Sequence, residues 1–209
     1  LRILWFIPRI MTKNLDSDGF RSIAENYDLF YIDLWGVVHN GVELHEGAIN
    51  TLKNLLKLNK KFVLLTNAPR PIFTVKSILE KMGMDKNLSN HVFTSGEASL
   101  SYLNKEHKSQ KFYHLGPPRD FDLFKDFKNY KSKTINESEY LLCTGLFDEH
   151  DKDLNFYKNL LEDYVSKKMI CTNPDLIVDK GNKRELCAGS VAMVFEKMGG
   201  EVVYFGKPY

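Results

Sequence analysis

Short apolar runs that end in a polar side chain alternate with helical stripes of apolar residues in the first half of this chain. The run Leu29–Asp33 ends in a carboxylate, and the run Lys61–Thr66 ends in a hydroxyl. Runs this apolar are typical of parallel strands that are buried on both faces. Because they alternate with helical segments, the pattern predicts a doubly wound α/β fold. The strands are expected at 29–33, 61–66 and 91–95, and the helices at 20–26, 46–58, 71–82 and 97–104.

The second half of the chain shows the same alternation less regularly. A stretch rich in Lys, Asp and Phe separates its first two expected strands, and Asn173–Pro174–Asp175 predicts a turn. A second α/β region is therefore expected. Its strands are predicted at 111–115, 140–144, 168–172 and 201–205, and its helices at 154–165 and 188–198.

The charge balance and the N-terminal residues limit the kinds of partner. Lys and Arg number 29 and Asp and Glu 27, so the net charge is only +2 with His neutral. A dedicated nucleic-acid binder would carry a larger basic excess. The apolar opening, residues 1–10, is shorter than the ~20 residues that span a bilayer, so no membrane partner is expected. Met11 is the expected true start, with the preceding residues as an upstream extension.

The cysteines do not form a recognisable framework. Cys143, Cys171 and Cys187 are odd in number and lack C-x-x-C spacing, which argues against paired disulfides and thiolate zinc sites. Each lies in or next to an apolar segment, where free Cys behaves as a small hydrophobe. We therefore expect reduced, structural cysteines and a cytoplasmic location.

Three polar side chains follow expected strands and are candidates for one site. Asp33 ends the first strand, Thr66 ends the second, and Lys207 lies just beyond the last apolar run. Ligands of open parallel sheets bind at the carboxyl ends of the strands. A carboxylate can attack phosphorus, a hydroxyl can bind phosphate oxygens, and an ammonium can offset two anions. Taken singly, Asp33 is more readily a cap or turn residue, Thr66 a strand-end hydroxyl and Lys207 a surface lysine. Taken together, the three favour a phosphoryl site.

Three segments resemble motifs of a known family. Asp33-Leu-Trp-Gly-Val-Val-His-Asn-Gly41, Leu64-Leu-Thr-Asn-Ala-Pro-Arg70 and Phe205-Gly-Lys-Pro208 are similar to the first three motifs of the haloacid-dehalogenase (HAD) superfamily. The closest similarity is to its class IIA, the NagD-like sugar-phosphate and pyridoxal-phosphate phosphatases. Further similarity lies at 93–96, 115–120, 172–175 and 188–190.

The resemblance implies a fold with two parts. It predicts a Rossmann-like parallel-sheet core with an inserted α/β cap of the C2 type. The first part of the core would span residues 15–101 and the cap 102–201. Residues 202–209 would be the second, incomplete part of the core.

The resemblance also implies roles for individual residues. Asp33 would be the nucleophile and a Mg²⁺ ligand, and the backbone carbonyl of Trp35 a second ligand. Thr66 and Lys207 would complete the catalytic set by binding phosphate and neutralising charge. The residues that would face phosphate and substrate are Asn67, Ala68, Arg70, Asn173 and Asp175. A proline-driven turn that touches nothing is an equally good interpretation of 172–175.

Trp35 departs from the family pattern. The family usually has an aspartate there, which protonates the leaving oxygen and later activates water. Such acid–base help is worth ~10²–10⁴-fold, so good leaving groups such as acyl or aryl phosphates would still react. His39 is a possible substitute, although a solvent-exposed loop histidine is the simpler interpretation.

The fourth motif of the family is absent from the sequence, which ends two residues beyond Lys207. That motif carries carboxylates that hold Mg²⁺, which prefers octahedral oxygen ligation. A shortened gene product or an incomplete sequence is the simplest account. We expect weak or no phosphatase activity, and self-association through an exposed apolar strand at 29–32.

The leading functional prediction is a Mg²⁺-dependent phosphatase that acts on a small phosphorylated metabolite through an aspartyl-phosphate. The alternative is a non-catalytic remnant that binds phosphate ligands. A receiver-type signalling domain is a third, weaker interpretation. The cap would also be the surface through which two copies of the chain form a homodimer.

Overall fold

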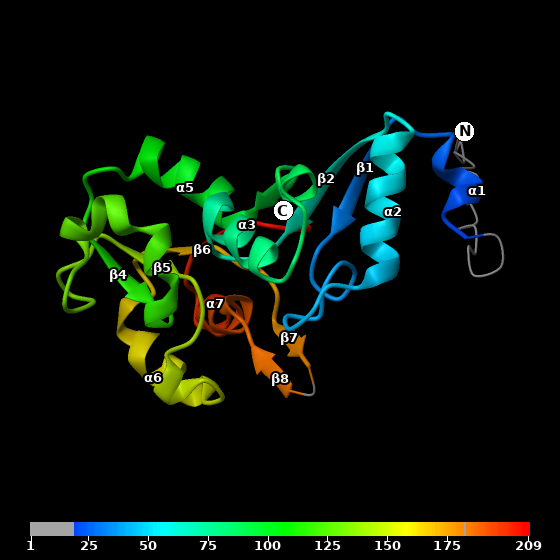
Figure 1. Ribbon diagram of the computed structural model, residues 1–209. Coiled ribbons are helices and arrows are strands. Elements are labelled where there is room, and N and C mark those ends of the chain that lie inside the picture. Colours follow the sequence, from blue (N-terminus) through cyan, green and yellow to red (C-terminus); the bar gives the residue numbers. More distant parts are fainter. Residues whose placement is uncertain (1–18, 182) are drawn as a thin grey trace, which may run out of the picture.

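Two parallel sheets, one in each half of the chain, organise the structure (Figure 1). The computed structural model describes residues 19–181 and 183–209. The expectations for residues 1–10 and Met11, and for a core beginning at residue 15, lie outside these ranges. The first lobe contains α1 (Arg21–Ala24), β1 (Leu29–Asp33), α2 (Glu46–Lys57), β2 (Lys61–Thr66), α3 (Ile72–Lys81), α4 (Lys86–Ser89), β3 (Val92–Thr94) and α5 (Ser95–Glu106).

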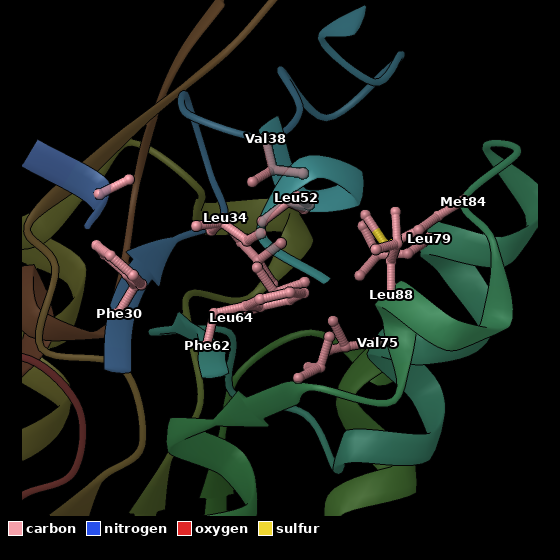
Figure 2. Packing of buried hydrophobic residues seen from close by; sticks show 13 residues of the cluster. Phe30, Leu34, Val38, Leu52, Phe62, Leu64, Val75, Leu79, Met84 and Leu88 are labelled. Atoms are coloured by element: carbon pink, nitrogen blue, oxygen red, sulfur yellow. The ribbon is translucent and has the colours of Figure 1, made fainter. Parts of the chain in front are cut away.

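The first sheet confirms the predicted parallel α/β alternation. Its strands lie in the order β1-β2-β3, and both pairings are parallel. Alternate residues of β2 face inward, where Phe62 and Leu64 are buried. Figure 2 shows Leu64 next to Leu34 and Leu52, so the loop after β1 and helix α2 share one core with the sheet.

Strand β1 differs from the prediction of burial on both faces. Phe30 is 8% exposed, whereas Leu29 is 44% and Tyr31 70% exposed. β1 is an edge strand of the first sheet, and its side chains alternate between the two faces. Among the described residues, the face that carries Leu29 and Tyr31 is not covered.

The second lobe is built on a four-stranded sheet in the order β4-β5-β6-β9, with all pairings parallel. Every residue of the central strand β5 is buried, as expected for a strand between two layers. Helices α6 and α7 pack on one face of this sheet. The elements are β4 (Phe112–Leu115), η1 (Pro118–Leu123), η2 (Lys125–Tyr130), β5 (Tyr140–Cys143), η3 (Asp148–His150), α6 (Leu154–Leu161), η4 (Glu162–Tyr164), β6 (Lys168–Cys171), β7 (Ile177–Lys180), β8 (Lys183–Leu186), α7 (Ala188–Lys197) and β9 (Val202–Tyr204).

The lobe boundaries differ from those predicted. The sequence boundary assigns residues 202–209 to the first region, but β9 pairs with β6 in the second sheet. The apolar run at 201–205 completes that sheet, and the return to the first lobe comes only at Gly206–Lys207. The boundary at 101/102 also falls inside α5, whose Leu103 packs in the second lobe.

The sequence patterns did not predict the β7–β8 hairpin. Its strands pair antiparallel, with Asp179 opposite Arg184. Both strands are largely exposed and rich in charged residues, so they lack the apolar alternation that marks a strand. Figure 1 shows the hairpin away from the four-stranded sheet and next to the loop that follows β1.

The three cysteines are free and buried, as predicted. Cys143 and Cys171 are neighbours on paired strands β5 and β6. Burial raises the pKa of the Cys187 thiol to about 12. Across the described residues, no helix combines the length and apolar character that crossing a membrane requires.

Candidate active site

Asp33 and Lys207 form an ion pair at the carboxyl edge of the first sheet. The Lys207 ammonium contacts Oδ1 of Asp33 and also donates to the backbone carbonyl of Leu65 at 2.9 Å. Asp33 ends β1, and Leu65 lies beside it in β2. The two charges are 174 positions apart in the sequence. The predicted proximity of this carboxylate and this ammonium is therefore found.

Asn67 holds the backbone of Lys207 in this position. Its side-chain oxygen accepts from the Lys207 N–H at 2.7 Å, and its Nδ2 donates to the Lys207 carbonyl at 3.0 Å. Gly206 precedes the lysine with φ +122°. A Cβ at Gly206 would lie 2.7 Å from the Asn67 oxygen and 2.7 Å from Pro174, so only glycine fits this approach.

The turn at 173–175 contacts the first lobe through the same amide. Asn67 Nδ2 donates to Oδ1 of Asp175 at 2.8 Å. The Asn173 side chain in turn accepts from the Asp175 N–H at 3.0 Å. The alternative in which this turn touches nothing is therefore wrong. In this arrangement the Asn67 carboxamide joins the two lobes.

Thr66 opens on a cleft between the lobes. It is 6% exposed, and its Oγ1 accepts from the Ala68 N–H at 3.2 Å, which leaves the hydroxyl proton free to donate. The cleft has a volume of about 570 Å³. Thr66, Ala68 and Arg70 line it from the first lobe, and Asn173 lines it from the second. Asp33 lines a separate hollow beside Tyr31 and Val37 and is not among the residues that line the cleft.

Arg70 is paired with an acid of the second lobe. Its Nε donates to Oδ1 of Asp120 at 3.1 Å. Asp120 is buried, and burial raises the pKa of its carboxyl while Arg70 acts in the opposite direction. Asp120 ends the segment 115–120 that resembles the family, but no signal in the sequence pairs it with Arg70.

Trp35 and His39 lie in the loop after β1. The Trp35 indole Nε1 donates to the backbone carbonyl of Asp179 at 2.7 Å. His39 is only 6% exposed, so the interpretation as a solvent-exposed loop histidine is wrong. Its Nδ1 accepts from the Gly41 N–H at 2.9 Å.

This hydrogen bond makes His39 a poor substitute for the family aspartate. Because Nδ1 accepts, the neutral ring carries its proton on Nε2. A second proton would have to enter on Nδ1 and would break the bond to Gly41. Burial, the largest cause, lowers the pKa of His39. The imidazole is therefore held in its neutral form near pH 7, in which it is not an acid.

The residues at this edge match part of a Mg²⁺ site. The Asp33 carboxylate and the Trp35 carbonyl are oxygen ligands of the kind that Mg²⁺ prefers. Within residues 19–181 and 183–209, no three His, Cys, Asp or Glu side chains cluster as a metal site.

Comparisons with known proteins agree with this fold. A family model described as haloacid dehalogenase-like hydrolase matches residues 30–128. A haloacid dehalogenase-like hydrolase from Brucella suis 1330 has a similar structure, with a TM-score of 0.82 and 29% identity; the match covers 91% of this chain and 70% of that one. No curated protein sequence matches the chain.

More distant structures share the fold. A possible sugar phosphatase from Cytophaga hutchinsonii has a TM-score of 0.72 and 21% identity, over 91% of this chain and 70% of that chain. A 4-nitrophenylphosphatase from Thermotoga maritima has a TM-score of 0.64 and 24% identity, over 88% and 69% of the two chains.

With parallel sheets, a carboxylate at the end of β1 and a lysine returning to it, the chain is similar to haloacid dehalogenase-like hydrolases, in sequence over residues 30–128 and in fold over most of its length. A structure named a putative nagD protein also shares the fold, with a TM-score of 0.62 and 24% identity over 86% of this chain and 70% of that chain.

Proposed function

We propose that this chain is a phosphomonoester hydrolase that acts on a small phosphorylated metabolite through an aspartyl-phosphate. The observation that carries the proposal is the Lys207 ammonium on the Asp33 carboxylate at the carboxyl end of β1. A carboxylate and a phosphate repel each other, and a fixed cation between them lowers that cost. The phosphatase names of the related structures support the same class of reaction.

The reaction has two steps. An oxygen of Asp33 attacks phosphorus, the ester P–O bond breaks, and the leaving oxygen departs with the bonding electron pair. Water then attacks phosphorus, the P–O bond to Asp33 breaks, and inorganic phosphate is released. Thr66 donates its hydroxyl proton to a phosphate oxygen, the Asn67 N–H serves the same anion, and Lys207 offsets the charge. The Asp33 carboxylate and the Trp35 carbonyl would hold Mg²⁺, which would supply further positive charge beside the phosphate.

The leaving group must be a stable anion. The Trp35 indole is bound to Asp179 and carries no acidic proton, and His39 is held neutral. The departing oxygen therefore takes its proton from water. This favours aryl and acyl phosphates over alkyl esters, for which acid–base help of ~10²–10⁴-fold is missing, and we expect weak turnover of the latter.

The second lobe, largely residues 102–201, acts in this proposal as a C2-type cap. Pairing of Asn67 with Asp175 and of Arg70 with Asp120 supports a closed arrangement over the cleft. Substrate would contact Ala68, Arg70 and Asn173. A cytoplasmic location is proposed because the cysteines are free, and a homodimer through the cap rests on the class IIA resemblance.

The test is a burst experiment with para-nitrophenyl phosphate and Mg²⁺. The wild-type chain should release about one equivalent of para-nitrophenol per chain, and Asp33→Asn should release none. The matched control is Asp28→Asn, an exposed carboxylate just before the same strand. A burst of para-nitrophenol from Asp33→Asn would show that Asp33 is not the nucleophile. Phosphate binding without any burst would favour the non-catalytic remnant.

A further inference from the structure

The hydrogen bond of Trp35 crosses between the two lobes. Its indole Nε1 is the only polar atom of that side chain, and it donates to the Asp179 carbonyl, 144 positions away, at 2.7 Å. Asp179 lies in β7, on the hairpin that the second lobe sends towards the first. The residue that replaces the family's expected aspartate therefore makes a structural contact that a carboxylate could not make with a carbonyl.

The loop after β1 is shaped to receive the ring. Gly41 has φ +87°, and a Cβ there would lie 2.7 Å from Cη2 and 2.8 Å from Cζ2 of Trp35. The indole thus lies against the Gly41 backbone. The His39 ring meets it edge-on, with centroids 5.1 Å apart. The Lys180 Cγ lies 3.4 Å from the same built Cβ, so the hairpin closes the other side of this contact.

The contacted hairpin forms part of the cleft wall. Trp35, Val178, Lys180 and Glu185 all line the cleft. Within the hairpin, Arg184 binds both carboxylate oxygens of Asp179, at 2.8 and 3.0 Å. That pair joins β7 to β8 only. The indole bond, in contrast, joins this wall to the first lobe.

We propose that Trp35 is a positioning residue that fixes the β7–β8 hairpin against the first lobe and thereby limits the size of substrate the cleft admits. The attachment of the hairpin is inferred only from the contacts of Trp35 with Asp179 and with the loop after β1. The effect on substrate size rests on the proposed phosphatase function.

Hydrogen exchange tests the attachment without any need for activity. Trp35→Phe keeps an aromatic ring but removes the N–H donor. Exchange of amides in residues 177–186 and in the loop 36–44 should become faster by about 2- to 12-fold, the factor that one hydrogen bond supplies. Arg184→Gln is the matched comparison, because it loosens the hairpin from within and should leave 36–44 unchanged. Unchanged exchange of both segments in Trp35→Phe would overturn the proposal.

A measurement on the wild-type protein guards against a variant that folds poorly. The chain has two tryptophans, and the indole N–H signal lost in Trp35→Phe identifies that of Trp35. If the bond to Asp179 exists in solution, this indole proton exchanges with solvent more slowly than a free indole. Exchange at the rate of a free indole would reject the contact.

Kinetics test the effect on substrate size. Trp35→Phe should lower KM for naphthyl phosphate relative to KM for phenyl phosphate by several-fold. A fall in kcat with unchanged hairpin exchange would assign Trp35 to the chemistry and refute a positioning role. If neither protein turns over, the phosphatase proposal fails, while the exchange data still decide the attachment.

Discussion

The Asn67 side chain positions Lys207 by hydrogen bonds to the lysine backbone, whereas the Asp33 carboxylate forms an ion pair with the lysine ammonium. One carboxamide binds the N–H and the carbonyl of Lys207 and the carboxylate of Asp175. An asparagine side chain has two N–H donors and one oxygen acceptor. In Asn67 the oxygen accepts one hydrogen bond and Nδ2 donates two. The family resemblance gives the Asn67 backbone a role in phosphate binding, and the Asn67 side chain has a separate role, which is to hold the backbone of Lys207.

At this scale we predict that Asn67→Ala destabilises the protein. The substitution removes three hydrogen bonds from a residue that is 8% exposed, so the free energy of unfolding should fall by about 1–3 kcal/mol. Urea unfolding measures it. Asn54→Ala, on the exposed face of α2, is the control and should change stability by less than about 0.5 kcal/mol. Equal effects of the two substitutions would contradict the bridging role.

At the scale of elements, the strand ends of the second sheet carry a buried polar pair. His114 of β4 shares a hydrogen bond of 2.9 Å with Thr144, just after β5. Gly116 makes room for it, because a Cβ there would overlap the Thr144 hydroxyl. Burial, helped by the nearby Lys131 charge, lowers the pKa of His114 to about 3.

This shift predicts an acid-sensitive fold. Between about pH 6.5 and pH 3 the unfolded chain binds a proton at His114 and the folded chain does not, so stability falls as the pH falls. The slope from one such group approaches about 1.4 kcal/mol per pH unit. Urea unfolding at pH 5 and pH 7 should show a smaller difference in His114→Gln than in wild type. His150→Gln, at a partly exposed site, should keep the wild-type difference.

At the scale of the whole molecule, the two lobes are joined by polar contacts around the cleft, while among the described residues one face of β1 is apolar and exposed. β1 is an edge strand, and Leu29, Tyr31 and Val37 are exposed near it. A hollow of about 360 Å³ lies beside them. An exposed apolar edge strand favours pairing with another chain.

We therefore predict that the 209-residue chain self-associates in solution. Tyr31→Lys places a charge on the exposed face of β1 and should shift the chain towards monomer. Light scattering at several concentrations gives the size. Phe73→Lys, at another exposed aromatic residue, is the comparison and should leave the size unchanged. A wild-type monomer at all concentrations would refute the prediction.

Local patterns in the sequence were enough to predict the parallel strands of both lobes and the long helices that pack on them. The strands at 29–33 and 61–66 and the helices at 46–57 and 188–197 follow from apolar periodicity, because each buries one continuous stripe or run. The sequence also predicted that Asp33 and Lys207 lie together, but the strand before Lys207 joins the second sheet, so the lysine reaches Asp33 from the loop after β9 and not from a shared sheet edge.

Only the tertiary structure decided the contacts between segments far apart in the sequence. The hairpin at 177–186 lacks an apolar alternation, and β9 joined the second sheet because β6 offered the free edge for it. Pairing of Trp35 with Asp179 and of Arg70 with Asp120 leaves no trace in either local sequence. Spacing within a sequence encodes which residues share a face of one element, whereas a contact across the cleft depends on how two lobes, each with its own core, pack together.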